Sequence, residues 1–251
     1  MSPTALFGLQ FSFSLVLSAI AVIDVAVLVG FAHVTLPTKA IAYVVAAAWF
    51  IMIVAITALG GFAPGAIGPL PGPVLPFAIL VIGGLVAWFA WPEFHKKMLS
   101  IPLAALLGVN ILRIGGIFFL MLMTQGRLAA PFAPSAGWGD IITGLAAIPL
   151  AWMAARGRAP SKGVLIAWNT FGTLDLFAAI AFGVLSAGGT PFQIFTDEPG
   201  TAAMGTLPWV GVPAFLVPLY LLTHLAIFAQ LGSHATHGDA GADMHRRPAR
   251  A

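Results

Sequence analysis

Long runs of apolar residues, separated by short segments rich in proline and glycine, make up most of this chain. Seven of them have about the 20 mostly apolar residues that a membrane-spanning helix needs. They cover 7–32, 40–62, 74–92, 99–123, 137–155, 163–187 and 209–231. The pattern predicts an all-α fold, a polytopic bundle of about seven transmembrane helices in one domain over residues 1–231. Residues 232–251 are polar and rich in glycine and alanine, which predicts a disordered tail.

Two of the runs leave the helix count open. The run 137–155 is short and contains Pro149, so six spans are a second interpretation. The run 7–32 begins near the N-terminus, as a signal peptide would. It is longer than the roughly 7–15 apolar residues of a signal-peptide core, and no basic segment precedes it. We therefore interpret it as a retained helix.

The basic residues gather on alternate connections between the predicted helices. One side of the membrane collects nine of them: Lys39, Lys96, Lys97, Arg156, Arg158, Lys162, Arg246, Arg247 and Arg250. The opposite side has Arg127, together with the acids Asp197 and Glu198. Because cytoplasmic loops are enriched in lysine and arginine, this distribution predicts a cytoplasmic C-terminus. Seven spans then place the N-terminus outside the cytoplasm.

The composition agrees with a lipid environment and excludes several classes of site. Only 8% of the residues are charged and 60% are hydrophobic, whereas a soluble domain has about 25% charged residues. The chain has no cysteine, which excludes disulfides, thiolate metal sites and cysteine nucleophiles. The net charge is only +3, so nucleic acid is not a predicted partner. The predicted partners are the bilayer, a small solute or protons, and a membrane-complex subunit.

Several polar residues fall inside the predicted helices, where lipid would not tolerate them. They are Asp24, Asn110, Arg113, Asp140, Asn169, Asp175 and His224. An ionised group at the bilayer centre costs about 2.5–3.5 kcal/mol on insertion scales. These residues should therefore face the bundle interior, pair with one another or line a wet cavity.

The depth of each residue along its helix narrows the pairing. With a rise of about 1.5 Å per residue, Arg113 is predicted to lie in the outer half of the membrane. It should pair with Asp175, with Asp140 or with both. The same reasoning predicts a second group nearer the cytoplasm, which contains His224, Asp24 and Asn169.

A structural interpretation stands beside each functional one. An ion pair of Arg113 can serve helix packing alone, and His224 can be a hydrogen-bonded packing residue. Asp140 can cap the start of its helix, because an acid there favours the helix dipole. Pro213 and Pro218 predict a bend in the last helix near the polar residues.

No cofactor or metal site is predicted. Among the six histidines only His224 lies deep in a span, so a haem held by two histidines would lack its second ligand. His234, His237 and His245 lie near two aspartates in the tail. Such a segment can bind copper or nickel weakly, but we interpret it as solvated. Seven spans with the N-terminus outside are also typical of rhodopsin-like proteins. The last predicted helix has no lysine for a retinal Schiff base, so a retinal-binding protein is not predicted.

Three stretches of the chain resemble, as a set, a group of bacterial multi-pass inner-membrane proteins of unassigned function. The resemblance covers roughly residues 100–230 and is carried by Asn110–Leu120 running on to Pro131–Ala133 and Gly137–Asp140, by Trp168–Asn169 with Leu174–Leu176, and by Pro213–Pro218 leading to His224. It implies a location in the bacterial inner membrane. It implies no reaction and no substrate.

Three hypotheses for function follow from the sequence. The leading one is a transporter-like or proton-relay protein, in which the buried Arg/Asp/His cluster handles a small solute or protons. The second is a membrane-embedded enzyme or cofactor-binding protein that acts on a lipid-soluble substrate. The third is a structural or assembly subunit of a membrane complex, in which the buried charges hold the helices together.

Overall fold

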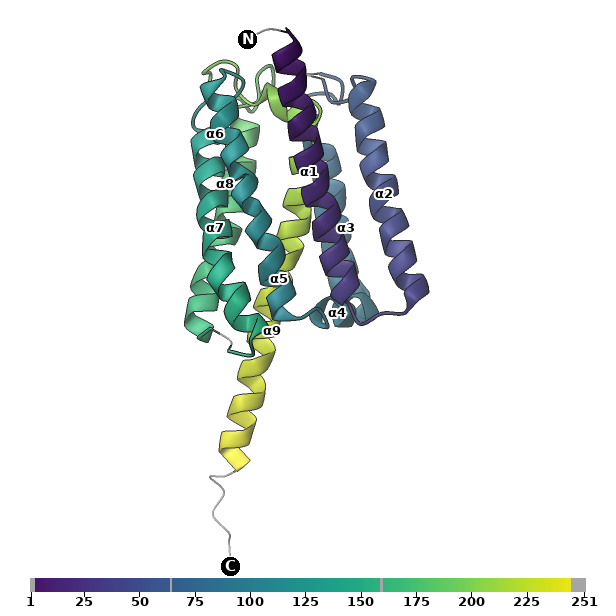
Figure 1. Cartoon of the computed structure of the whole chain (residues 1–251), viewed down its shortest axis with the longest axis vertical. Helices are drawn as coiled ribbons and strands as arrows, with labels where there is room; N and C mark the ends of the chain where they lie inside the picture. Colours follow the sequence, from purple (N-terminus) through teal and green to yellow (C-terminus); the bar gives the residue numbers. More distant parts are fainter. Residues whose placement is uncertain (1–2, 64, 159, 245–251) are drawn as a thin grey trace, which may run out of the picture.

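The computed structural model describes residues 3–63, 65–158 and 160–244, and the side chains of 12–233 within them. All regular elements in these ranges are helical. They are α1 (Pro3–Phe31), α2 (Leu36–Ala58), α3 (Val74–Ala90), α4 (Pro92–Leu99), α5 (Leu103–Val109), η1 (Asn110–Gly116), α6 (Ile117–Thr124), α7 (Phe132–Ala155), α8 (Lys162–Leu185), η2 (Ala202–Gly205), η3 (Val212–Leu216) and α9 (Val217–Met244). The long helices run side by side as a bundle (Figure 1).

Within the described residues, six helices or helical stretches are long and apolar enough to cross a membrane. A seventh is counted if α3 and α4, which meet at an angle of 100°, form one bent span. The predicted all-α fold with six or seven apolar helices is therefore confirmed. The short member is α3, with 17 residues, and not the helix that contains Pro149.

Helix α7 begins earlier than the sequence indicates. It starts at Phe132 rather than near Gly137, and it continues through Pro149 to Ala155. Pro131 precedes the helix and Pro134 lies in its first turn, where a proline removes no intrahelical hydrogen bond. The additional turn moves Asp140 from the expected helix start into the helix interior.

Helix α9 also extends further than expected. The sequence predicts disorder from residue 232, whereas α9 continues to Met244. A helix that is already formed adds one hydrogen bond for each further residue, and no proline interrupts this segment before Pro248. Residues 245–251 of the predicted tail lie outside the described part of the chain.

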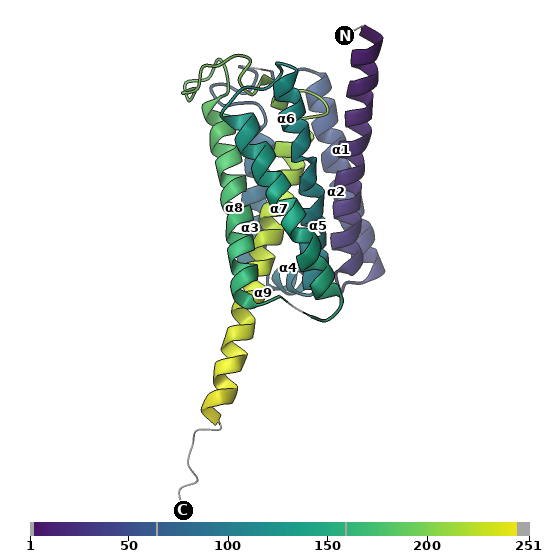
Figure 2. The same ribbon diagram turned by 60° about the vertical axis from the view of Figure 1, so that its left-hand side comes forward.

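Helix α9 runs through the middle of the bundle in both views (Figures 1 and 2). Helices α7 and α8 pack together on one side of it, and α1 and α3 lie on the other. Helix α2 lies at the edge, where the Trp49 indole Nε1 donates a hydrogen bond to the Ala214 carbonyl at 3.0 Å. This arrangement gives α9 access to groups from both halves of the bundle.

Two of the spanning stretches are not regular α-helix along their whole length. The stretch from α5 to α6 passes through the 3₁₀ segment η1, and α9 is preceded by the π-helical turn η3, which contains Pro213. Segment η1 packs closely on α7, because Gly144 has no side chain. A Cβ on Gly144 would lie 2.7 Å from the backbone nitrogen of Ile114. Both irregular segments adjoin the buried polar residues.

The space around Gly144 and Gly108 predicts opposite effects when each is replaced by alanine. Gly144→Ala should destabilise the protein by about 1–3 kcal/mol, because the added methyl group overpacks a backbone contact. Gly108→Ala has open space around its Cβ and should stabilise by about 0.5–1 kcal/mol, because alanine favours the helix. Unfolding midpoints in detergent measure both. Equal midpoints for the two variants would contradict this packing.

Candidate functional site

The guanidinium of Arg113 lies between two carboxylates from neighbouring helices. Its Nε donates to Oδ1 of Asp140 on α7 at 2.7 Å. Its Nη2 donates to Oδ2 of Asp175 on α8 at 2.5 Å. The structure thus contains both of the ion pairs that the sequence offered as alternatives. One cation is shared by two acids.

The third nitrogen of Arg113 is also occupied. Nη1 lies 3.2 Å from the carbonyl oxygen of Gly172 and 2.9 Å from Nε2 of His224. Since arginine only donates hydrogen bonds, Nε2 of His224 must be the acceptor. The other ring nitrogen, Nδ1, lies 2.7 Å from Oδ1 of Asn169, whose Nδ2 donates back to the His224 carbonyl at 3.0 Å. These bonds assign a neutral imidazole with its hydrogen on Nδ1.

The cluster is almost completely buried. Arg113 is 2% exposed, and His224 and Asn169 are 1% and 0% exposed. The Asp140 side chain retains the most exposure, at 17%. With both acids ionised, the charges of Arg113, Asp140 and Asp175 sum to −1. Asp140 is thus the most exposed carboxylate of this net-negative cluster.

Glycines at three positions make room for these side chains. A Cβ on Gly139 would collide with the Asp175 carboxylate, and one on Gly172 would lie 2.7 Å from the His224 ring. A Cβ on Gly116 would lie 2.5 Å from the Cβ of Asp140. Small residues allow close approach of helices in membranes. Here they let α7, α8 and α9 enclose one guanidinium.

A second buried acid lies beside the cluster. Asp24 on α1 is 0% exposed, and its Oδ2 accepts a hydrogen bond from the Tyr220 hydroxyl at 2.9 Å. Its Oδ1 has no hydrogen-bond partner among the described residues. The Tyr220 ring also lies below the Arg113 guanidinium, with 5.8 Å between Cζ and the ring centroid. Tyr220 therefore links Asp24 to the Arg113 cluster.

Asn110 lies on η1, one helical turn before Arg113. Its Nδ2 donates to the Leu106 carbonyl at 2.9 Å and to Thr223 Oγ1 at 3.3 Å. Asn110 thereby joins the α5–η1 stretch to α9 and takes no direct part in the ion cluster.

Two expectations about these residues were wrong. His224 and Asn169 do not form a separate group nearer the cytoplasm, because His224 directly contacts Arg113. The long arginine side chain spans the difference in depth that the backbone positions suggested. Asp140 does not cap a helix start either, since α7 begins eight residues before it at Phe132.

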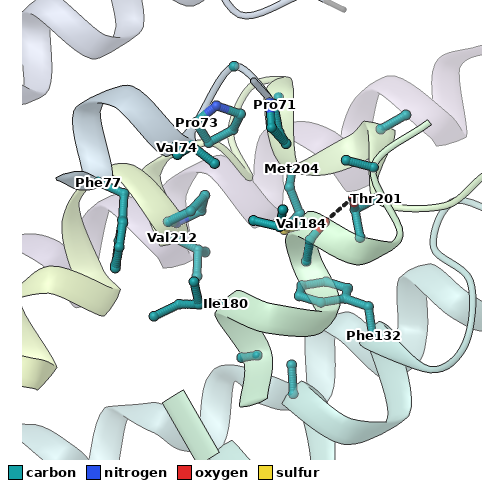
Figure 3. Close-up of a pocket in the computed structure, with 18 of the residues that line it drawn as sticks. Pro71, Pro73, Val74, Phe77, Phe132, Ile180, Val184, Thr201, Met204 and Val212 are labelled. Atoms are coloured by element: carbon teal, nitrogen blue, oxygen red, sulfur yellow. Dashed lines mark hydrogen bonds between the residues drawn. The ribbon is translucent and has the colours of Figure 1, made fainter. Parts of the chain in front are cut away.

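Next to Asp140 the bundle contains a cavity of about 460 Å³. Its walls come from α3, α7, α8 and η3, and include Phe77, Phe132, Ile180 and Val212 (Figure 3). The connections between α2 and α3 and between α8 and η3 cover it at the end of the bundle where the N-terminus lies (Figures 1 and 2). Thr201 Oγ1 fastens the second connection by donating to the Gly183 carbonyl at 2.9 Å.

No feature of the sequence predicted this cavity. Its covering connections, 61–73 and 190–208, are largely apolar and rich in proline. That composition fits both short rigid links and segments buried by protein. The sequence did not predict the hydrogen bond that the Tyr220 hydroxyl donates to Asp24. Tyr220 lies four residues before His224, and this spacing places the two on one helix face. It was a signal for Tyr220 as a member of the site, but not for its contact with Asp24 on α1.

The arrangement brings no group of three or more His, Asp or Glu side chains into metal-binding proximity within the described residues. The tail histidines His234, His237 and His245 lie outside the residues whose side chains are described. His33 and His95 lie away from the cluster, where the His95 ring stacks on Trp88 at 4.4 Å between centroids.

The shared guanidinium predicts a specific pattern of stability. Arg113→Met leaves two carboxylates without their cation and should destabilise the protein by about 3–5 kcal/mol. Adding Asp175→Asn to that variant removes one of the unpaired charges and should recover part of the loss. Unfolding midpoints in detergent test this. Asp175→Asn alone completes the comparison. If the stability lost in the double variant equals the sum of the losses in Arg113→Met and Asp175→Asn, the two residues are not coupled.

A family model matches residues 71–232, described as Domain of unknown function (DUF8737). The matched segment begins just before α3 and includes η1, α7, α8 and most of α9, and so carries every member of the Arg113 cluster. Asp24 on α1 lies before it. Neither the curated proteins nor the solved structures contain a match to the chain. Since the match covers more than half of its length, the chain belongs to the DUF8737 family.

Proposed function

We propose that this protein is a transporter-like membrane protein that binds a small, mostly apolar solute in the cavity and couples its binding to protonation of the Arg113 cluster. We further propose seven spans in a bacterial inner membrane, with the N-terminus outside and the C-terminus in the cytoplasm. The cavity would then lie toward the outer side of the membrane.

One observation carries the functional proposal. Asp140 lines the apolar cavity and is also a direct partner of Arg113. A solute that reaches Asp140 therefore touches the one partly exposed carboxylate of a buried, net-negative cluster. A cluster that served packing alone would have no need of a cavity beside its most exposed acid.

The chemistry of the cluster suits the exchange of a proton. Arginine keeps its charge, so a proton that enters the cluster is carried by Asp140 or Asp175. A charge brought near one carboxylate changes which acid holds the proton, because the two acids share one cation and titrate as a coupled pair. Solute binding at Asp140 would in this way be communicated to Asp175.

An enzymatic role for His224 receives less support. Its two ring nitrogens are engaged by Arg113 and Asn169, and the residue does not line the cavity. A general base must reach the proton that it removes. The carboxylate of Asp140 is better placed than His224 to meet a bound molecule.

Filling the cavity tests the proposed binding. Ala179 lines it, so Ala179→Trp should reduce the affinity for a fluorescent apolar probe by at least roughly tenfold, since indole would occupy the same volume. Ala178→Trp on the same helix is the matched control and should retain the affinity. Titration in nanodiscs measures both. Unchanged binding by Ala179→Trp would contradict a solute site here.

Orientation can be tested by cysteine labelling, because the chain has no cysteine of its own. Asp197→Cys should react with a membrane-impermeant maleimide in intact cells, since its loop is proposed to lie outside. Lys96→Cys should react only after the membrane is permeabilised. The reverse pattern would overturn the proposed topology.

A further inference from the structure

We propose that the solute of this cavity is a small organic cation, either a protonated lipophilic amine or a quaternary ammonium compound. This inference rests on the proposed function, because it names the chemical class that the same cavity selects. It is carried by three features of the site: the charges along the cavity, the aromatic rings in its wall, and the saturation of Arg113.

The charged residues that line the cavity are both acids. Asp140 lies at its inner end beside Arg113, and Glu198 lies in the exposed connection that covers it. None of the lining residues that the structure describes is lysine or arginine. Because both charged residues of the lining are acids and its walls are apolar, the cavity favours a cation over a neutral molecule or an anion.

The wall itself is suited to an organic cation rather than to a hydrated metal ion. Four phenylalanines contribute to it: Phe62, Phe77, Phe119 and Phe132. The faces of aromatic rings attract ammonium groups and are used to recognise quaternary ammonium ligands. The remaining lining is largely aliphatic, which stabilises the hydrocarbon part of an amphiphilic cation but offers few oxygen ligands to a metal.

Arg113 does not make the cavity a site for anions, although it lies close by. All three guanidinium nitrogens are already bonded, to Asp140, to Asp175, and to Gly172 and His224. Arg113 is 2% exposed and does not line the cavity. A carboxylate ligand would have to displace one of these buried partners and leave it unpaired, which is costly.

The site also has a net negative charge that a bound cation would neutralise. Arg113 balances one of its two carboxylates, and the excess negative charge extends to the cavity through Asp140. A bound ammonium group beside Asp140 would bring the total for the three residues and the ligand to zero. A quaternary ammonium achieves this without giving up a proton, whereas a protonated amine can also exchange one with Asp140.

Three probes that share a phenylbutyl group and differ in the charge of their end group test the inference. We suggest phenylbutyl-trimethylammonium, the neutral hydrocarbon in which carbon replaces its nitrogen, and phenylpentanoate as the anion. Titration into the purified full chain in nanodiscs, with the Ala179→Trp protein as the blank for lipid partitioning, measures specific binding. The cation should bind at least roughly tenfold more tightly than the neutral analogue, and the anion should bind weakest.

Two variants keep the test falsifiable. Asp140→Asn should remove most of the preference for the cation. Glu198→Gln, at an exposed position, should weaken the binding of the cation by a few-fold and leave the binding of the other two probes unchanged. If the neutral analogue or the anion binds as tightly as the cation, and Ala179→Trp abolishes that binding, the cavity takes apolar molecules but the inference is wrong. If no probe binds specifically, the proposed function fails with it.

Discussion

The shared guanidinium of Arg113 is the interaction on which the rest of the structure depends. A single cation joins carboxylates from α7 and α8, a carbonyl from α8 and a histidine from α9. Inside a bundle of apolar helices, each of these groups would be costly without a partner. The glycines at 116, 139 and 172, which bring the helices close enough, follow from the same requirement. The position of Asp140 beside the cavity is fixed by it as well.

Much of the fold could be predicted from the sequence, because each spanning helix is encoded by an uninterrupted apolar run. Apolar runs of spanning length identify the helices, and proline and glycine mark the breaks between them. The predicted helix boundaries were wrong where one sequence signal is compatible with two structures. Prolines can end a loop or open a helix, and here Pro131 precedes α7 while Pro134 lies in its first turn. The segment after residue 231 has turn-forming glycines, but it continues α9 to Met244.

The candidate site could be predicted in its members and only partly in its geometry. An ionised residue in a lipid-facing run must be sheltered, so Arg113, Asp140 and Asp175 were identifiable from type and position alone. His224 was assigned to the wrong group, because depth along a helix ignores the reach of an arginine side chain. The cavity was not predictable, since connections distant in sequence cover it and their proline-rich composition does not reveal what lies beneath.

We propose that the cavity and the buried ion cluster communicate through Asp140. Infrared difference spectroscopy of the carboxyl stretching region, recorded as phenylbutyl-trimethylammonium binds to the protein in lipid, tests this most directly. Binding should change a carboxyl band, and this change should be absent in the Asp140→Asn protein. Saturating binding with no carboxyl change, or the same change in the Asp140→Asn protein, would contradict it.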